Sequence, residues 1–270
     1  MHIKQAASDR LLWLSADRLL YAGLLGEASV RSFGAYTLYV SLGGPSRASI
    51  DGGDWESADL VVVPPYVPHR IVAGGRSICK VMIEAETVDS ALLPPLLRGP
   101  GGGVDAPELV ARVHGIYARL LRSGRETDFQ QLDFDRDVIG HALAARVVDP
   151  RIAAALAHIR NAPSGPATAE DMADLAGLSF SRFLHLFKQE TGTSLRNLRA
   201  WKRARSLLHY VSTASNLTDI ALDAGYPDST HFSHSIRRIY GLKPRDIVAG
   251  SRKLTVFRPV GHPIPEGSLC

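Results

Sequence analysis

A repeated pattern near the carboxyl end constrains the fold of this chain more than any other feature of its sequence. Residues 171–179 read DMADLAGLS and residues 219–226 read DIALDAGY, so the two copies lie 48 positions apart. Each copy places an alanine four residues before a glycine and an apolar residue directly after that glycine. A small alanine lets two helices approach closely, and a glycine ends a helix in the left-handed conformation. The repeat therefore predicts two helix-turn-helix units.

Each copy continues into a second predicted helix with the same internal spacing. Two apolar residues four positions apart face the core, and a glycine ends the helix. These residues are Phe183, Phe187 and Gly192 in the first copy and Phe232, Ile236 and Gly241 in the second. Thr168 and Asn216 precede the two copies by three residues, where we expect helix caps. Agreement at so many linked positions argues against a chance match.

A further predicted helix, Leu195 to Val211, connects the two units. Its apolar stripe consists of Leu198, Trp201, Ala204, Leu207 and Leu208. At about 1.5 Å per residue it is roughly 25 Å long, so it could hold two recognition helices near one turn of B-DNA apart, about 34 Å. Its other face carries the cations Arg196, Arg199, Lys202, Arg203 and Arg205. These cations are either a solvated helix face or contacts for DNA phosphates, and their position beside two recognition helices favours the second reading.

The amino-terminal half has the pattern of short strands separated by turns, from about Leu19 to Val88. The predicted strands are residues 36–42, 59–63 and 78–83, which are rich in β-branched or alternating apolar residues. Turns rich in glycine, proline or aspartate separate them, at residues 43–45, 51–54, 64–65 and 74–75. Such spacing predicts a small β-barrel or β-sandwich.

The apolar period becomes helical after the loop at residues 99–103. Leu109, Val113, Ile116 and Leu120 stack along one face at steps of three and four, and a second helix is expected from Phe134 to Val148. The apolar stripe packs either on its own domain or on a second copy of the chain. The last residues, from Ser251, are rich in proline and glycine, and we expect them to be extended or loosely docked.

Charge and composition limit the class of protein. Residues 1–150 have a net charge of −3 and residues 151–250 a net charge of +5, which favours a polyanionic partner for the carboxyl-terminal half. Charged residues interrupt any signal-like stretch in residues 1–30, and no run approaches the roughly 18 apolar residues of a membrane span. Cys79 and Cys270 form no disulfide framework, so we expect a reduced, cytoplasmic protein.

The carboxyl-terminal pattern resembles the DNA-binding domain of the AraC/XylS family of transcriptional regulators. The matching stretches are residues 176–179, 182–183, 186–188, 192, 204, 207–208, 219–221, 224–226, 241 and 244. Ile236 stands where the family usually has phenylalanine, and Ile247 where it usually has an aromatic residue, but both remain apolar. The resemblance implies a regulator that binds a double-stranded DNA operator as a homodimer and activates transcription by touching RNA polymerase, although repression stays open.

Carried over by position, the resemblance assigns two groups of DNA contacts. The base-reading residues are Ser181, Leu184, His185, Ser229, Thr230, His231 and His234. The phosphate-contacting residues are Arg182, Lys188, Arg196, Arg203, Arg237 and Arg238, together with the amino terminus of each recognition helix. Because no arginine, asparagine or glutamine occupies a base-reading position, the strongest bidentate readers are missing, and we expect a contribution from DNA shape.

The strand-rich half resembles the cupin-like sensory domain often joined to this DNA-binding domain, best over residues 59–70. A metal-dependent cupin needs further histidine and carboxylate ligands on an earlier strand. Residues 28–33 hold no histidine, and His69 alone cannot make a metal site, so a cupin enzyme is disfavoured and we expect neither metal nor cofactor. A small-molecule effector of unknown identity is the better hypothesis, with the candidate lining Arg31, Tyr36, Tyr39, Trp55, Tyr66 and His69.

Alternatives remain open for this half. The aromatic residues could be plain core, and Arg31 could pair with an anionic effector or with an acidic neighbour such as Glu84. The half could also serve only to dimerise, in which case the regulator needs no effector. We therefore expect a multidomain protein, with an N-terminal cupin-like β-barrel, a helical linker and an all-α domain with two helix-turn-helix motifs. The expected boundaries are 1–95 for the sensory domain, 104–149 for the linker or dimerisation region, 150–250 for the DNA-binding domain and 251–270 for a flexible tail.

Overall fold

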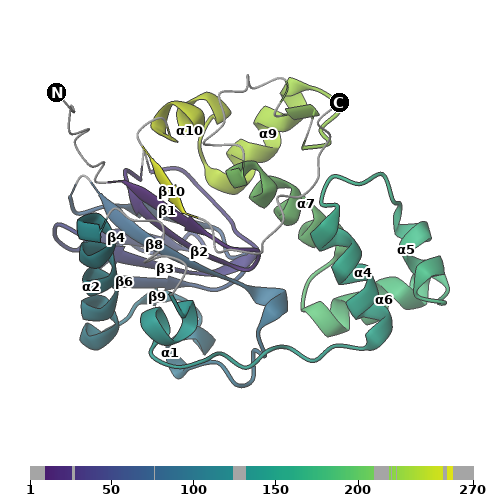
Figure 1. The fold of residues 1–270 in the computed structure, drawn as a ribbon, viewed down its shortest axis with the longest axis horizontal. Helices are drawn as coiled ribbons and strands as arrows, with labels where there is room; N and C mark the ends of the chain where they lie inside the picture. Colours follow the sequence, from purple (N-terminus) through teal and green to yellow (C-terminus); the bar gives the residue numbers. More distant parts are fainter. Residues whose placement is uncertain are drawn as a thin grey trace.

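A computed structural model describes residues 10–25, 28–75, 77–123, 132–209, 219, 221–222, 224–251 and 254–257 (Figure 1). Its strands are β1 (Leu11–Leu14), β2 (Arg18–Gly23), β3 (Ala35–Ser41), β4 (Ser46–Ile50), β5 (Glu56–Ala58), β6 (Leu60–Val63), β7 (His69–Val72), β8 (Ile78–Glu84), β9 (Gly102–Gly103) and β10 (Thr255–Phe257). The three predicted strands are confirmed as β3, β6 and β8. The strand region begins earlier than expected, because β1 precedes Leu19.

The strands form two sheets. Seven strands pair in the order β10-β1-β2-β8-β3-β6-β9, and three pair in the order β5-β4-β7. The expected closed β-barrel is wrong at this level of detail, because the pairings of the described strands leave these two sheets separate. The long central strands of the larger sheet are joined by antiparallel pairing of β8 with both β2 and β3. The amino-terminal half is therefore a β-sheet domain whose centre is β8.

Alternation along β8 divides its side chains between two cores. Cys79, Val81 and Ile83 pack in the core beneath the helices that follow the sheet. Ile78 and Met82 pack in a second core on the opposite face. Since successive side chains of a strand point to opposite faces, Lys80 and Glu84 share the face of Ile78 and Met82. One face of β8 thus brings a cation and a carboxylate into an apolar core.

Helices cover the first face of the large sheet. They are α1 (Pro95–Arg98), α2 (Pro107–Ser123) and the π-helical turn η2 (Asp135–Ile139). The predicted stripe of α2 is buried in the core of its own domain, as the first of the two alternatives expected. The helix expected from Phe134 to Val148 is wrong beyond Ile139, because Gly140 takes a left-handed conformation, with φ +102°, and ends the turn. In the described residues, no helix is long and apolar enough to cross a membrane.

The carboxyl-terminal half is helical. Its described elements are α4 (Pro150–Asn161), α5 (Ala169–Leu175), α6 (Phe180–Thr191), α7 (Leu195–Ser206), η3 (Leu207–His209), α9 (Ser229–Tyr240) and α10 (Pro244–Ser251). Thr168 caps α5 as predicted, in a reciprocal capping box with Asp171. The cap predicted at Asn216 lies outside the described residues. The connecting helix α7 is shorter than predicted, at 12 residues or about 18 Å, since its last turn is the 3-10 helix η3.

The two helix-turn-helix units differ in what they pack against. The first unit, α5 and α6, has a core of its own with α4, which contains Phe183 and Phe187. The second unit shares a core with the large sheet, and Phe232 and Ile236 of α9 belong to the same cluster as Ile78 and Met82. In Figure 1, α4, α5 and α6 stand apart from the sheet, whereas α9 and α10 lie beside it.

The end of the chain adds to this second junction. The expectation of a loosely docked tail from Ser251 is wrong for residues 255–257, which form β10 and pair in parallel with β1. Phe257 of β10 is buried in the core between the large sheet and the helices that cover it. The sheet domain therefore contains strands from both ends of the sequence, with the helical half between them.

Candidate nucleic-acid interface

The first recognition helix, α6, presents a polar face to solvent. Phe183 and Phe187 are buried, with their rings 5.8 Å apart, and fix which side of α6 faces inward. Gly177 and Gly192 adopt the left-handed conformation, with φ +61° and +75°, so the helix begins and ends where the repeat predicted. The predicted DNA contacts Ser181, Arg182, His185 and Lys188 are exposed, and Leu184 is half-buried.

The second recognition helix, α9, is fixed by an aspartate that the sequence analysis did not single out. Asp228 caps α9 and accepts hydrogen bonds from the backbone N–H groups of Thr230 and His231, both at 2.8 Å. Its other oxygen lies 2.7 Å from Nδ1 of His231, and these bonds hold the pKa of Asp228 below its usual range. The imidazole of His231 is thereby oriented with Nε2 away from the cap. The amino terminus of α9 is already occupied by a carboxylate, unlike that of α6, where Ser179 makes no side-chain cap.

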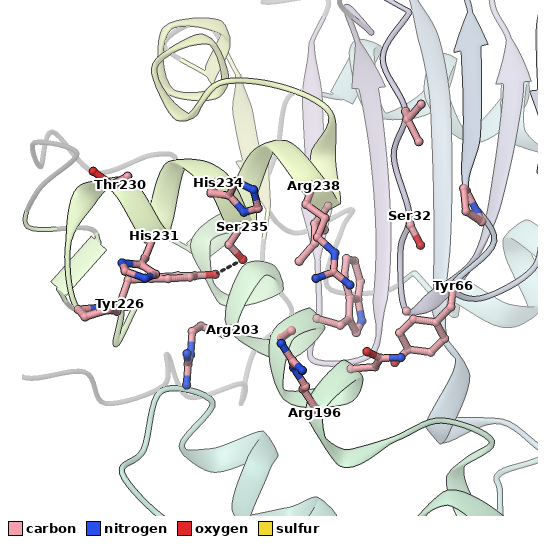
Figure 2. A pocket seen from close by; sticks show the side chains of 18 residues that line it. Ser32, Tyr66, Arg196, Arg203, Tyr226, Thr230, His231, His234, Ser235 and Arg238 are labelled. Carbon is pink, nitrogen blue, oxygen red and sulfur yellow. Dashed lines mark hydrogen bonds between the residues drawn. The ribbon is translucent and has the colours of Figure 1, made fainter.

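The other predicted contacts of α9 lie on two sides of the helix. Thr230, His231, His234 and Arg238 line a cleft of about 860 Å³ between the helical half and the sheet domain. Figure 2 shows these side chains on one wall and Ser32 and Tyr66 on the other. Ser229 and Arg237 line a separate hollow of about 260 Å³ next to the start of α10. We call the first hollow the interdomain cleft.

The cations of α7 divide between two environments. Arg196 and Arg203 line the interdomain cleft (Figure 2), and the guanidinium of Arg203 lies 5.5 Å from the ring centre of Tyr226. Arg199 donates a hydrogen bond to the backbone oxygen of Gly165. Lys202 and Arg205 are buried, 8% and 4% exposed, against the sheet domain. The cationic face predicted for α7 is therefore wrong for these last two residues, because carboxylates of the sheet domain bind them.

The predicted effector-binding residues do not meet in one cavity. Tyr39 is buried and hydrogen-bonded to His69, with its hydroxyl 2.8 Å from Nε2. Burial lowers the pKa of His69 to about 4. Tyr36 lies in the core beneath α2. Trp55 is exposed in the segment between β4 and β5, where the guanidinium of Arg47 lies 5.4 Å from its ring centre. The two that face cavities are Tyr66, in the interdomain cleft, and Arg31, in a different cavity.

That second cavity is apolar and contains an unusual lysine. It measures about 270 Å³ and lies between the large sheet and the second helix-turn-helix unit. Lys80 reaches it from β8 and lies 4.9 Å from the ring centre of Phe33. Burial, with Arg31 and Arg205 nearby, lowers the pKa of Lys80 to about 7. A lysine inside the apolar segment of residues 78–83 was the signal in the sequence that could have identified this cavity.

The remaining lining of this cavity, which we call the effector cavity because it is the candidate site for an effector, comes from both halves of the chain. Leu12, Leu19 and Leu25 contribute from the sheet domain and Leu208, Tyr240 and Ile247 from the helical half. Its charged residues are Arg10, Arg31, Lys80 and Asp246, and Asp246 lies 3.6 Å from the guanidinium of Arg245. No salt bridge among the described residues includes Lys80. In the same part of the chain, no group of three His, Cys, Asp or Glu side chains could hold a metal ion.

Comparisons with known proteins support the helix-turn-helix assignment. The family described as "Helix-turn-helix domain" matches residues 172–249. The invasion protein InvF of Salmonella typhi is 35% identical over 72 residues, which are 26% of this chain and 33% of InvF. The transcriptional activator RhaS of Salmonella arizonae is 31% identical over 159 residues, which are 57% of this chain and 51% of RhaS. The chain thus spans a third to a half of the length of these relatives.

The solved structures extend the likeness to the whole fold. ToxT of Vibrio cholerae O395 superimposes with a TM-score of 0.57 at 9% identity, over 87% of this chain and 97% of ToxT. A ToxT structure bound to an unsaturated fatty acid has a TM-score of 0.53 at 10% identity, over 89% of this chain and 98% of ToxT. At such identity the likeness concerns the fold: a β-sheet domain followed by a helical domain with two helix-turn-helix units.

Proposed function

Because the chain belongs to the AraC/XylS family of helix-turn-helix transcriptional regulators, we propose that it binds a double-stranded DNA operator and activates transcription. It acts in the cytoplasm as a homodimer, and each copy contributes α6 and α9 to the operator. RNA polymerase is the partner through which it activates. RhaS, a transcriptional activator over half of whose length this chain aligns, supports activation rather than repression.

The observation that carries this proposal is the pair of recognition helices with matching ends. Both α6 and α9 end at a left-handed glycine, bury a pair of apolar residues four positions apart, and leave hydroxyl and imidazole groups exposed. Ser181, His185 and Thr230 can bond base edges in the major groove. Arg182 and Lys188 lie on the exposed side of α6, where they can neutralise phosphates. Family members are transcription factors, so these groups serve binding and not catalysis.

Replacing Arg182 with alanine should weaken DNA binding by a similar factor for every sequence. Each phosphate contact contributes about 0.9 to the slope of log K against log salt concentration, so the slope should fall by about one. Fluorescence anisotropy with an operator and with unrelated duplex, at several salt concentrations, measures both quantities. Arg70→Ala, at an exposed position on β7, is the matched control. It should leave the affinity and the salt slope unchanged for both the operator and the unrelated duplex. Equal slopes for Arg182→Ala and the unchanged protein would remove α6 from the interface.

We also propose that the effector cavity takes an anion with an apolar tail. Its lining is mostly leucine, isoleucine and aromatic side chains, and Lys80 lies inside it with no carboxylate bound to its ammonium group among the described residues. Ligand sites of this kind combine an apolar wall with a few polar groups that fix orientation. The carboxylate of a fatty acid would pair with Lys80 and Arg31, and the bound fatty acid of ToxT supports this class.

Fatty acids such as oleate should raise the melting temperature of the protein, and the corresponding alcohols should not. The carboxylate stabilises the folded state by mass action because it pairs with Lys80, whereas an alcohol leaves the ammonium group unpaired. Thermal denaturation with matched acid and alcohol pairs measures this. Equal shifts for acid and alcohol would indicate tail binding alone. The absence of any shift would favour a regulator whose sheet domain serves only to dimerise.

A further inference from the structure

A buried group of charged side chains connects α7 to the end of β8. Glu84, the last residue of β8, is 1% exposed, and Glu86 of the 3-10 helix η1 (Ala85–Thr87) is 7% exposed. Lys202 and Arg205 of α7 face them. The four residues are 116 or more positions apart in sequence across this junction, so the contact joins the sensory sheet directly to the DNA-binding half. We call Glu84, Glu86, Lys202 and Arg205 the α7 anchor.

Three side chains of α7 donate hydrogen bonds to Glu84. Glu84 accepts hydrogen bonds from Nε1 of Trp201 at 2.7 Å and from Nζ of Lys202 at 2.7 Å through one oxygen, and from Nε of Arg205 at 3.1 Å through the other. Lys202 also pairs with Glu86. Arg205 continues to the backbone oxygens of Ser15 and Arg18, both at 3.1 Å. The anchor therefore sets both the position and the rotation of α7.

The pKa values of the anchor residues depend on their burial and on one another's charges. Burial lowers the pKa of Lys202, but the two carboxylates outweigh burial, so its pKa is raised overall. Burial raises the pKa of Glu86, and Lys202 offsets only part of that rise. A charge left alone in such a place is strongly unfavourable, so the anchor is either complete or released into water.

The interdomain cleft lies in front of α9. With α7 anchored, Arg196 and Arg203 of α7 and His231 and His234 of α9 face the sheet domain across the interdomain cleft (Figure 2). The volume of about 860 Å³ falls within the range of small-molecule sites, roughly 300–1,000 Å³. A DNA duplex does not fit inside a hollow of this size, so DNA can approach these side chains only from the open side of the cleft, and the sheet domain limits the angle of approach.

We propose that Glu84 and Glu86 restrain DNA binding by holding α7, and that DNA phosphates compete with these carboxylates for the cations of α7. The inference rests on the proposed function, since it assigns a regulator of the same DNA interface. Release of the anchor frees α7 and α9 from the sheet and returns Lys202 and Arg205 to the cationic face that the sequence predicted. The two glutamates are thus positioning residues, which act on DNA through α7.

The indole of Trp201 reports directly on the anchor. Its ring is buried at the junction and bonded to Glu84, whereas Trp13 lies in the core on the opposite face of the sheet. Full-length protein labelled with 5-fluorotryptophan gives separate ¹⁹F signals, and Trp201→Phe assigns the one of interest. Saturating operator DNA should move the Trp201 signal and make it sensitive to exchange of H₂O for D₂O. The Trp13 signal should stay unchanged and serves as the internal control.

The outcomes separate this inference from the proposed function. If DNA binds with the expected salt dependence and the Trp201 signal stays shielded from solvent, the anchor does not open and the inference fails while the proposed function stands. If no DNA binds, the proposed function is wrong, and the inference that rests on it is wrong as well. As a control, DNA is added to Arg182→Ala at a concentration that binds the unchanged protein but not this variant. Both signals should then stay in place, which excludes an effect of unbound DNA on the free protein.

A charge-neutral variant tests the competition itself. Glu84→Gln combined with Glu86→Gln should raise DNA affinity about tenfold, because a larger fraction of the protein is competent to bind. The salt dependence should steepen by up to about two, one for each freed cation. Asp54→Asn with Glu108→Gln removes the same charge from exposed positions of the sheet domain and corrects for its general repulsion of DNA. Equal affinities for the two double variants, with both folded by circular dichroism, would overturn the inference.

Discussion

Replacing Trp201 with alanine should lower the free energy of unfolding by about 4 kcal/mol, the usual cost of removing a large buried aromatic side chain. The ring is 2% exposed and lies between the two halves of the chain, 5.8 Å from the ring centre of Phe33 and 6.5 Å from that of Tyr240. We expect the loss to loosen the β-sheet domain and the second helix-turn-helix unit together. The reason is that both halves contribute to one hydrophobic cluster.

Phe183→Ala provides the matched comparison. Phe183 is 0% exposed in the separate core of the first helix-turn-helix unit, so its loss should cost about as much, roughly 4 kcal/mol, but only locally. Chemical denaturation gives the free energy of each variant, and amide hydrogen exchange shows where protection is lost. Loss of protection confined to helices in Trp201→Ala would contradict a shared core. Loss of protection in the sheet of Phe183→Ala would contradict a separate first unit.

Replacing Lys80 with methionine should stabilise the ligand-free protein by about 3 kcal/mol. The burial that lowers its pKa from 10.5 to about 7 is an unfavourable free energy for the charged side chain, at about 1.4 kcal/mol per pKa unit. Attraction to the rings of Tyr21, Phe33 and Tyr240 offsets part of this cost, and the cavity admits some solvent. Methionine keeps the length and apolar contacts of the side chain.

The pH dependence has a definite sign. Between pH 7 and 10.5 the unfolded chain holds a proton on Lys80 that the folded chain has released, so the stability of the unchanged protein should rise with pH across this window. Lys80→Met should lack this contribution and should also lose the selective response to fatty acids. Since a carboxylate prefers the charged lysine, fatty acid affinity should fall as pH rises above about 7. Denaturation midpoints and calorimetry at several pH values measure both trends. A parallel pH dependence in the two proteins would contradict the burial of this charge.

The sequence was sufficient for the helix-turn-helix units because their signals are local. The capping box of Thr168 and Asp171, the left-handed turns at Gly177 and Gly225, and the buried pair Phe183 and Phe187 each depend on residues a few positions apart. The predicted strands followed for the same reason, since period-two alternation is visible in a short window. Local chemistry thus specified the elements and the exposed faces of α6 and α9.

Contacts between elements that are distant in the sequence have no such local signal. On α7, Arg203 and Arg205 are two positions apart and equally basic, yet one lines a cleft and the other binds Glu84, which is 121 positions away. Helical periodicity fixes the direction of a side chain but not its distant partner. The effector cavity depends on a distant contact as well, because residues of the helical half form one of its walls. The expected grouping of Tyr36 with Tyr39 fails for a local reason: they are three positions apart on β3, so strand alternation places them in different cores.

The most direct test is a footprint of the full-length protein on operators selected from random duplex DNA. We predict that each copy of the chain protects two major-groove segments about one helical turn apart on the same face of the duplex, one for α6 and one for α9. Protection of a single segment per chain, or no preferred sequence and no sensitivity to salt, would contradict a regulator that reads DNA with both helices.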